Sequence, residues 1–469
     1  MVVVSTILLI ALSLVILGVC VRDVLSAGKE AVSMKIIFLL GFLFFQPLST
    51  TFTLLTGETD VLYVEDQGTS AFIFALLATL FVSIFLWAYS RGWGVVAIAR
   101  RPTPDWSATT QGLIGASVVC FAVGFICRDI IGTTVPILGV LTFQLASGMY
   151  VASVGFAAWA WFRNPRQVFV GAWLLIAIVG VSAAFLSLEW SRRGIISVFI
   201  GVVWVGYYVT WRYLARKRFL KWMILLLLVG MIPVLLQSAL RGAAQGGGGS
   251  QRSSSAVGGL AGYIDALTRM SPGDLFAPIM EIAAAQFAGS NSLWLIEECP
   301  RLQPYWPLHQ LIYLTVQPVP RVLWEGKPTG LGREMVIVGG VQRVGDEHNL
   351  GPGIIGHCWV DLWWLSVPLY ATLLGLVMRY LDERAAFCAT VPWIVIPLGA
   401  GTAHIFGIPR GETGLFAFNA VAAISGAWVV SMIAMYFFAD RSSSMMLVDE
   451  GEDRDPPSHG ADLGHAMPE

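Results

Sequence analysis

Residues 2–21 of the chain read VVVSTILLIALSLVILGVCV, a run without a single charged side chain. A helix needs about 20 apolar residues to cross roughly 30 Å of hydrocarbon, and only a helix or a closed barrel pairs every backbone polar group there. The run therefore predicts a membrane-spanning helix. A cleaved signal peptide is the alternative, but no basic residue precedes the run, and the residue before Cys20 is Val19 rather than a small one.

The composition extends this interpretation to the whole chain. Of its 469 residues, 56% are hydrophobic and 13% are charged, and the mean hydropathy is +0.71. These values exclude an ordinary soluble protein. We predict an all-α, polytopic integral membrane protein with eleven spans. They cover residues 2–21, 34–55, 70–90, 110–127, 138–162, 168–188, 194–211, 219–240, 356–378, 386–408 and 413–438.

Lysine and arginine are unevenly distributed between the connections. The first, third, fifth and seventh connections carry these bases, whereas residues 57–70, between the second and third spans, carry acids and no base. Because cytoplasmic connections are enriched in Lys and Arg, we expect the N-terminus outside and the C-terminus in the cytoplasm.

This topology divides the chain into four parts. Residues 1–240 form an eight-span bundle, and residues 241–355 form a large external loop that opens with a flexible Gly/Ser linker over 241–259. Residues 356–438 supply the last three spans. The acidic tail, 439–469, is expected to be disordered in the cytoplasm.

The external loop contains a cluster of cations. Residues 316–335 read VQPVPRVLWEGKPTGLGREM, in which prolines and glycines prevent a continuous helix around Arg321 and Lys327. Free backbone amides beside permanently charged guanidinium groups suit a phosphate. The alternative is that these cations only contact anionic lipid headgroups.

Two further basic groups are predicted at the same depth. Arg192 and Arg193 lie in the short outer turn between the sixth and seventh spans, three residues after Glu189, and Arg410 lies in the outer turn before the last span. Arginines on outer turns run against the positive-inside trend, and ionisable groups at membrane edges often mark function. Together with the loop cations, they are expected to surround one anionic head.

Acid–base candidates occur near the ninth span. His357 and Asp361 are one helical turn apart and share a face. Because an unpaired Asp within a span is costly, Asp361 should meet a polar cavity or an arginine. A purely structural ion pair is the alternative.

Two short motifs carry less information. Residues 351–356, GPGIIG, match a dinucleotide-binding pattern but follow no strand, so we interpret them as a turn into the ninth span. Residues 453–455, DRD, match a metal-binding spacing but fall in the tail, and no metal site is expected there.

One segment resembles a known family. Pro320-Arg321-x-Leu323-Trp324-x-x-Lys327-Pro328 is similar to the signature of the O-antigen polymerases, which join oligosaccharide repeat units, and residues 191–194, SRRG, resemble a second mark of that family. The resemblance covers most of residues 30–438. Residues 356–363, GHCWVDLW, differ from the family pattern Gly-Glu-x-Tyr-x-Asn/Asp-Phe-Gly, because His357 replaces the glutamate whereas Asp361 matches.

The resemblance implies a metal-independent, multi-span (GT-C-like) glycosyltransferase without a cofactor. Its substrate would be an oligosaccharide linked to a polyprenyl pyrophosphate, such as undecaprenyl pyrophosphate, at the outer face of a bacterial inner membrane. A chain-length regulator is a further candidate partner, and nucleic acid is not expected. Arg192, Arg193, Arg321, Lys327 and Arg410 would bind the pyrophosphate. The candidates for the base are Asp361, His357, Glu189 and Glu412. An O-antigen ligase-like transferase and a lipid-glycan transporter or flippase are the alternatives.

Overall fold

The computed structural model describes residues 1–26, 30–59, 61–103, 107–189, 192–215, 217–223, 225, 268, 287–341 and 350–440. In this part of the chain, the regular structure is helical except for one short antiparallel ladder. There β1 (Ser107–Ala108) pairs with β2 (Ala439–Asp440). The predicted all-α class is confirmed at this level.

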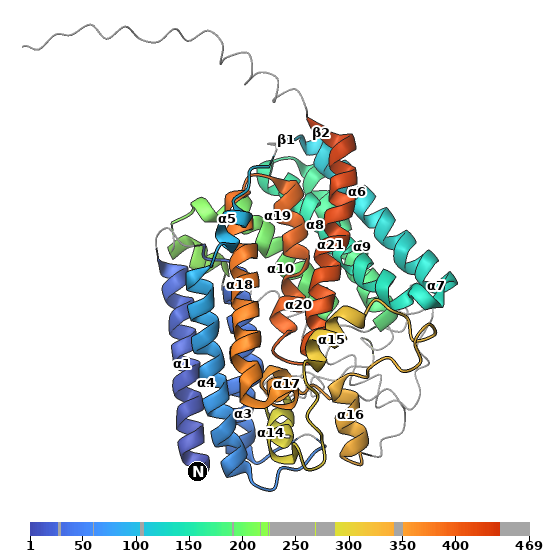
Figure 1. The fold of residues 1–469 in the computed structure, drawn as a ribbon. Helices are drawn as coiled ribbons and strands as arrows, with labels where there is room; N and C mark the ends of the chain where they lie inside the picture. Colours follow the sequence, from blue (N-terminus) through green and yellow to red (C-terminus); the bar gives the residue numbers. More distant parts are fainter. Residues whose placement is uncertain are drawn as a thin grey trace, which may run out of the picture.

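Eight helical segments among the described residues are long and apolar enough to cross a membrane, and they form a bundle (Figure 1). The first six coincide with the first six predicted spans. They are α1 (Val2–Leu25), α2 (Met34–Leu43) with η1 (Phe44–Leu48) and α3 (Ser49–Thr56), α4 (Gln67–Arg91), α6 (Thr110–Phe125) with η2 (Ile126–Ile131) and α7 (Gly132–Thr134), α8 (Gly139–Arg163), and α9 (Val168–Glu189). The last two are the segment Gly353–Phe387 and α21 (Thr413–Phe438).

Three later predicted spans, the seventh, eighth and tenth, do not correspond to any of these eight segments. α10 (Arg192–Val209) occupies the predicted seventh span but is short, whereas residues 219–240 lie largely outside the described part of the chain. The predicted tenth span, 386–408, is divided between the end of α18 (Ser366–Phe387), α19 (Pro392–Ala400) and α20 (Thr402–Gly407). Pro392 begins a new helix, and Pro397 lacks a backbone donor. The count of eleven therefore stays a prediction.

The predicted ninth span is not one continuous helix. α17 (Gly353–Leu362) ends at Trp363, whose φ of 56° and ψ of −140° are not helical, and α18 follows after η7 (Trp363–Leu365). The Ser366 hydroxyl stabilises this break by donating to the carbonyls of Cys358 and Trp363. Of residues 351–356, predicted as a turn, only Gly351 and Pro352 precede the helix, and α17 already begins at Gly353, whose φ is +69°.

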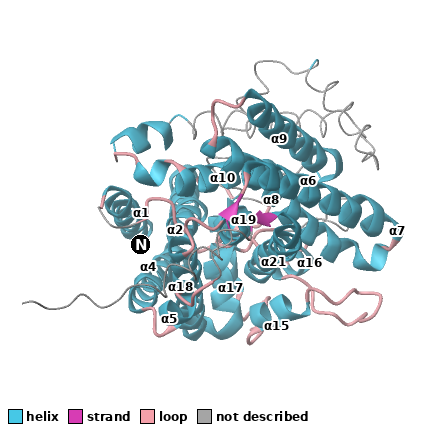
Figure 2. Cartoon of the chain, turned by 90° about the horizontal axis from the view of Figure 1, so that it is seen from above, coloured by secondary structure: helices cyan, strands magenta, loops and turns pink. Residues whose placement is uncertain are grey.

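Small residues let the central helices cross closely. α8 packs against α6, α9, α10, α19 and α21, and Figure 2 shows it in the interior with α1 and α9 at the periphery. A Cβ added to Gly148 of α8 would lie 1.9 Å from the Ala423 carbonyl oxygen of α21, and one on Gly426 would lie 2.6 Å from that of Leu145. Such close approach is typical of helices packed within membranes.

The described part of the long loop lies at one end of the bundle, which we call the loop end. It comprises α14 (Ala288–Glu298), α15 (His309–Val316) and α16 (Leu331–Val338), and the N-terminus of the chain lies toward the same end (Figure 1). The Glu297 carboxylate accepts hydrogen bonds from the backbone N–H groups of Glu65 and Asp66 at 2.9 and 2.6 Å. The acidic second connection and the long loop thus share one end, as the predicted alternation requires.

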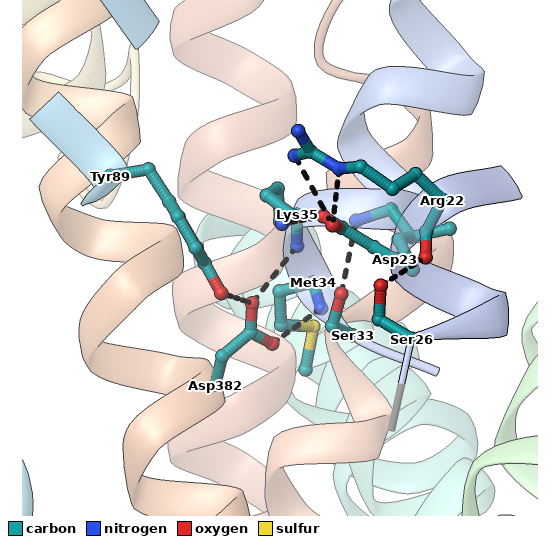
Figure 3. A network of polar contacts seen from close by, with 9 residues as sticks. Arg22, Asp23, Ser26, Ser33, Met34, Lys35, Tyr89 and Asp382 are labelled. Atoms are coloured by element: carbon teal, nitrogen blue, oxygen red, sulfur yellow. Dashed lines mark hydrogen bonds and ion pairs between the residues drawn. The ribbon is translucent and has the colours of Figure 1, made fainter. Parts of the chain in front are cut away.

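The opposite end, which we call the ladder end because it holds β1 and β2, gathers charges from several connections. Asp382 of α18 accepts the first backbone N–H groups of α2, from Met34 at 2.6 Å and Lys35 at 3.2 Å, and the hydroxyl of Tyr89 at 2.8 Å (Figure 3). The Lys35 ammonium pairs with Asp23. These contacts cap α2 and join α1, α2, α4 and α18. Which side of a membrane each end faces stays a prediction.

Candidate functional site

Buried polar side chains meet at the loop end between α15, α17, α18 and the residue before α21. We call this group the Gln310 cluster, and each member exposes at most 8% of its surface. Its members are His309, Gln310, His357, Asp361, Tyr370 and Glu412. Because a buried polar group is costly unless it is hydrogen-bonded, the partners of these side chains determine what the cluster can do.

α17 places His357 and Asp361 side by side, and Gln310 contacts both. The Gln310 side-chain nitrogen is 2.5 Å from His357 Nδ1, and its backbone N–H donates to Asp361 Oδ2 at 3.2 Å. The Tyr370 hydroxyl donates to the same carboxylate oxygen. We expected Asp361 to meet a polar cavity or an arginine; among the described residues, its partners are a backbone amide and a phenol.

The orientation of the Gln310 amide fixes the tautomers of two histidines. Gly414 N–H, which can only donate, is 2.7 Å from Gln310 Oε1, so the amide nitrogen faces His357 Nδ1 and, at 3.3 Å, His309 Nδ1. Each Nδ1 must then accept, and the ring proton of each neutral histidine is on Nε2. The contact of His309 Nε2 with the Thr329 carbonyl at 2.9 Å agrees with this assignment.

Glu412 joins the cluster from the residue just before α21. Its Oε1 accepts the backbone N–H of Gly332, in the first turn of α16. Burial raises the pKa of Glu412 to about 7, although hydrogen bonds from Gly332 and Leu331 favour the charged form; the charge of Asp361 raises the pKa further. A Cβ at position 330 would lie 2.7 Å from Glu412 Oε1, so a larger residue there would displace the carboxylate.

Three buried atoms of the cluster have no hydrogen-bond partner among the described residues. They are His357 Nε2, Asp361 Oδ1 and Glu412 Oε2. The first and third are 3.5 Å apart, too far for a good hydrogen bond. The cluster thus offers one N–H donor and two carboxylate oxygens. Together they match a ligand group, such as a hydroxyl, that both accepts and donates hydrogen bonds.

The two loop cations behave differently from each other. Lys327 is buried, and its ammonium donates to the carbonyls of Gln317 at 3.0 Å and Val319 at 2.9 Å. Burial lowers the pKa of Lys327, and the nearby Arg321 charge adds to the effect. Arg321 is exposed, and its guanidinium donates to the carbonyls of Lys327 at 3.2 Å and Pro328 at 3.3 Å. Lys327 therefore faces its own loop, whereas Arg321 lies at the surface.

Tyr313 of α15 is close enough to both Arg321 and Glu412 to feel their charges. A Cβ on Gly330 would be 3.3 Å from the Tyr313 hydroxyl and 2.7 Å from Glu412 Oε1, so the phenol and the carboxylate flank the same glycine. Burial raises the pKa of Tyr313 to about 12; the charge of Glu412 adds to this increase, and that of Arg321 opposes it. Arg321 and Glu412 are thus within electrostatic reach of one phenol.

The other predicted site residues are only partly placed. Arg410 precedes Glu412 by two residues, and its guanidinium lies 5.9 Å from the centre of the Phe45 ring. Arg192 and Arg193 begin α10, and Glu189 ends α9, but the side chains of all three lie outside the described part of the structure. Their convergence with Arg321 stays a prediction.

Sequence reasoning missed a buried arginine. Arg128 lies in η2, inside the segment Thr110–Thr134, and its guanidinium donates to the Ala184 carbonyl of α9 at 2.6 Å. The predicted fourth span ended at residue 127, because we took the charge of Arg128 as the end of the span. The neighbouring Asp129, which accepts from the Tyr150 hydroxyl at 3.1 Å, was the available signal, because adjacent charges of opposite sign can remain inside an apolar segment.

Comparison with known proteins adds no family to this geometry. No protein-family model, curated protein or solved structure matches the chain. Among the described residues, no three His, Cys, Asp or Glu side chains are arranged to hold a metal ion. The chemical capacity of the site consists of proton transfer by Glu412, Asp361 or His357, and of charge supplied by Arg321.

Proposed function

We propose that the protein is a membrane glycosyltransferase that polymerises polyprenyl-pyrophosphate-linked oligosaccharide repeat units into an O-antigen or exopolysaccharide at the outer face of the bacterial inner membrane. The observation that carries this proposal is the convergence of His357, Asp361 and Glu412 near the exposed Arg321. The similarity of residues 320–328 to the polymerase signature gives the reaction class.

Arg321 suits the donor half of the reaction. When a glycan leaves its carrier, the pyrophosphate departs with the bonding electron pair, and fixed positive charge lowers the barrier to this step. Two of the Arg321 N–H groups hold the exposed loop, and a guanidinium has five donors in all. Arg192, Arg193 and Arg410 complete the proposed anion site. Lys327 has a different role in this proposal, because its ammonium holds the loop in shape.

The cluster suits the acceptor half. The attacking sugar hydroxyl must lose a proton, which requires an acceptor within hydrogen-bond reach. Glu412 and Asp361 each keep one carboxylate oxygen without a partner among the described residues. A lone packing histidine would not explain why the Glu412 carboxylate lies 3.5 Å from it while Gln310 links it to Asp361.

The lipid carrier has an apolar surface available next to Arg321. Val322, Leu323 and Trp324 expose 73%, 72% and 41% of their surface. Such exposure is unfavourable in water but favourable where a loop meets hydrocarbon, and Trp is enriched at that interface. In the proposed complex, the polyprenyl chain lies along these residues while its pyrophosphate reaches Arg321.

The test is polymerisation by the purified protein. It is mixed in detergent with polyprenyl-pyrophosphate-linked repeat units, and the products are separated by size on a gel. A ladder with one repeat unit per step supports the proposal. A lack of products longer than one repeat unit, from substrate that a known polymerase extends, overturns it.

Two experiments distinguish the alternatives. In the purified preparation, a ligase would transfer glycan only when a lipid acceptor is added. In cells, deletion of a ligase would leave no surface lipid that carries glycan. Deletion of a polymerase would leave lipid capped with one repeat unit. A transporter would leave chain length unchanged and would require a sealed vesicle.

A further inference from the structure

We propose that Glu412 takes the proton of the acceptor hydroxyl, that His357 donates a hydrogen bond to the oxygen of that hydroxyl, and that Gln310 is the positioning residue that keeps His357 in its donating tautomer. This inference rests on the proposed function, and it specifies how the acceptor is bound and deprotonated.

The first step of the argument is that His357 is a donor rather than a base. Gly414 N–H fixes the amide of Gln310, and the amide N–H fixes His357 Nδ1 as an acceptor, so the proton is on Nε2. A neutral histidine with its proton on the reacting side cannot accept another there. It can only donate. The Gly411 backbone lies close to the His357 ring but makes no hydrogen bond of good geometry with Nε2, so this N–H is available for a substrate oxygen.

The second step is the choice between two carboxylates. Each carboxylate has one engaged oxygen and one without a partner among the described residues. The oxygen without a partner that lies 3.5 Å from His357 Nε2 is Oε2 of Glu412. A hydroxyl oxygen about 2.8 Å from both atoms, to one side of the line that joins them, would accept from the histidine and donate to Glu412. Asp361 stays beside them as a fixed negative charge.

The electrostatic surroundings suit Glu412 as a base. It faces His357 and Asp361 of α17 and Tyr313 of α15; Arg321 lies beyond the phenol, and Arg410 precedes it in its own turn. Its pKa of about 7 is close to neutral pH, where a general base is most effective. His309 also borders Gln310, and burial lowers its pKa, which favours its neutral form.

The bond changes balance in this arrangement. The acceptor oxygen forms a bond to the anomeric carbon of the donor glycan, and the bond from that carbon to the pyrophosphate oxygen breaks. The pyrophosphate leaves with the electron pair, next to Arg321. The hydroxyl proton moves to Glu412, which then releases it to water.

The first measurement is the pH dependence of polymerisation in detergent. The wild-type kcat/KM should rise with pH through about 7 as Glu412 loses its proton. Glu412→Gln should lower kcat ~10²–10⁴-fold and remove this rise. Glu412→Asp should recover part of the activity together with the rise, which a folding defect would not produce. Glu298→Gln is the control, because Glu298 is a buried loop-end acid paired with Arg301 outside the cluster.

The second measurement reads the tautomer without activity, by ¹⁵N NMR of the full-length protein labelled at histidine. His357 should be protonated on Nε2 in the wild type and in Gln303→Met, which changes another buried glutamine of the same loop. Gln310→Glu should move the proton to Nδ1, because a carboxylate can only accept. This variant should lower kcat more than it raises KM.

The outcomes separate the two proposals. If the wild type polymerises and Glu412→Gln does so equally well with the same pH profile, this inference is overturned while the proposed function stands. If His357 is protonated on Nδ1 in the wild type, or if Gln310→Glu leaves the tautomer unchanged, the role of Gln310 is wrong. If the wild type makes no polymer, both the role of Glu412 and the proposed function fail.

Discussion

Lys327 Nζ lies 3.0 Å from the carbonyl oxygen of Gln317, the residue directly after α15, and this contact ties the proline- and glycine-rich loop back to the helix before it. A second contact, to Val319 at 2.9 Å, strengthens the connection. The loop that carries Arg321 is therefore held in shape from inside by a buried cation.

Replacing this cation should affect stability. Lys327→Met removes the donor from two carbonyl oxygens, and a buried polar group that loses its partner costs ~1–3 kcal/mol. We expect the thermal unfolding midpoint in detergent to fall, with Lys327→Arg closer to wild type. A Lys327→Met protein that unfolds at the wild-type temperature would contradict the role of this contact.

Replacing Arg321 should instead affect activity. Arg321→Ala should reduce chain extension ~10²-fold or more, because a charge that stabilises the leaving pyrophosphate is lost. Protein level and unfolding temperature should change little, since the side chain is exposed. Arg321→Lys restores the charge without the planar fork and should recover only part of the activity. Arg301→Ala, at another exposed loop-end arginine, should extend chains normally.

Glu412 makes stability depend on pH. Because burial raises its pKa from 4.5 to about 7, the folded protein binds the proton more tightly than the unfolded chain. This contribution is fully present below pH 4.5 and is lost as the pH rises through 7, a loss of about 3 kcal/mol. His309 acts oppositely: burial lowers its pKa, so stability falls as the pH drops below about 6.5.

Glu412→Gln isolates the first effect. The variant should be more stable than wild type at pH 8 and should lose that advantage toward pH 4.5, while the histidine contribution is common to both proteins. Thermal unfolding midpoints measured across this range test the sign. A stability difference that is independent of pH would contradict the raised pKa.

Asp382 should be needed for stability at the ladder end. Asp382→Ala removes the acceptor for two backbone N–H groups of α2 and for the Tyr89 hydroxyl. Loss of a helix cap alone costs ~0.5–2 kcal/mol. The variant should unfold at a lower temperature, yet the molecules that fold should polymerise at the wild-type rate. A variant that is inactive although folded would assign Asp382 a further role.

The crossing of α8 and α21 allows a matched pair of glycine substitutions. Gly148→Ala should destabilise the protein by ~1–3 kcal/mol or more, because its Cβ would fall 1.9 Å from a backbone oxygen that cannot move away alone. Gly18→Ala, in α1, meets no atom within 4 Å and should be neutral or slightly stabilising. Unfolding midpoints of the two variants that do not differ would contradict the close crossing.

Hydropathy predicted the helices that are apolar along their whole length, because each signal lies within one stretch of sequence. It gave the approximate positions of α1, α4 and α21. It did not reveal the end of α17 at Trp363, since the run of apolar residues continues through the break and only the backbone geometry changes.

The site was predictable only in part, for the same reason. His357 and Asp361 were identifiable because a charged or polar group in an apolar stretch is conspicuous. Gln310 was not, since an uncharged glutamine in a loop gives no signal, and its importance comes from contacts with residues 47, 51 and 104 positions away. Lys327 was identified as a cation, but the direction in which its side chain points depends on how the loop turns back on itself.

The position of Glu412 and Gly414 along the chain affects how the protein matures. A ribosome delivers these residues only with α21, the last helix among the described residues, after the long loop and α17 have been synthesised. The centre around Gln310 therefore cannot assemble before α21 has emerged. Only a molecule with α21 inserted would contain it.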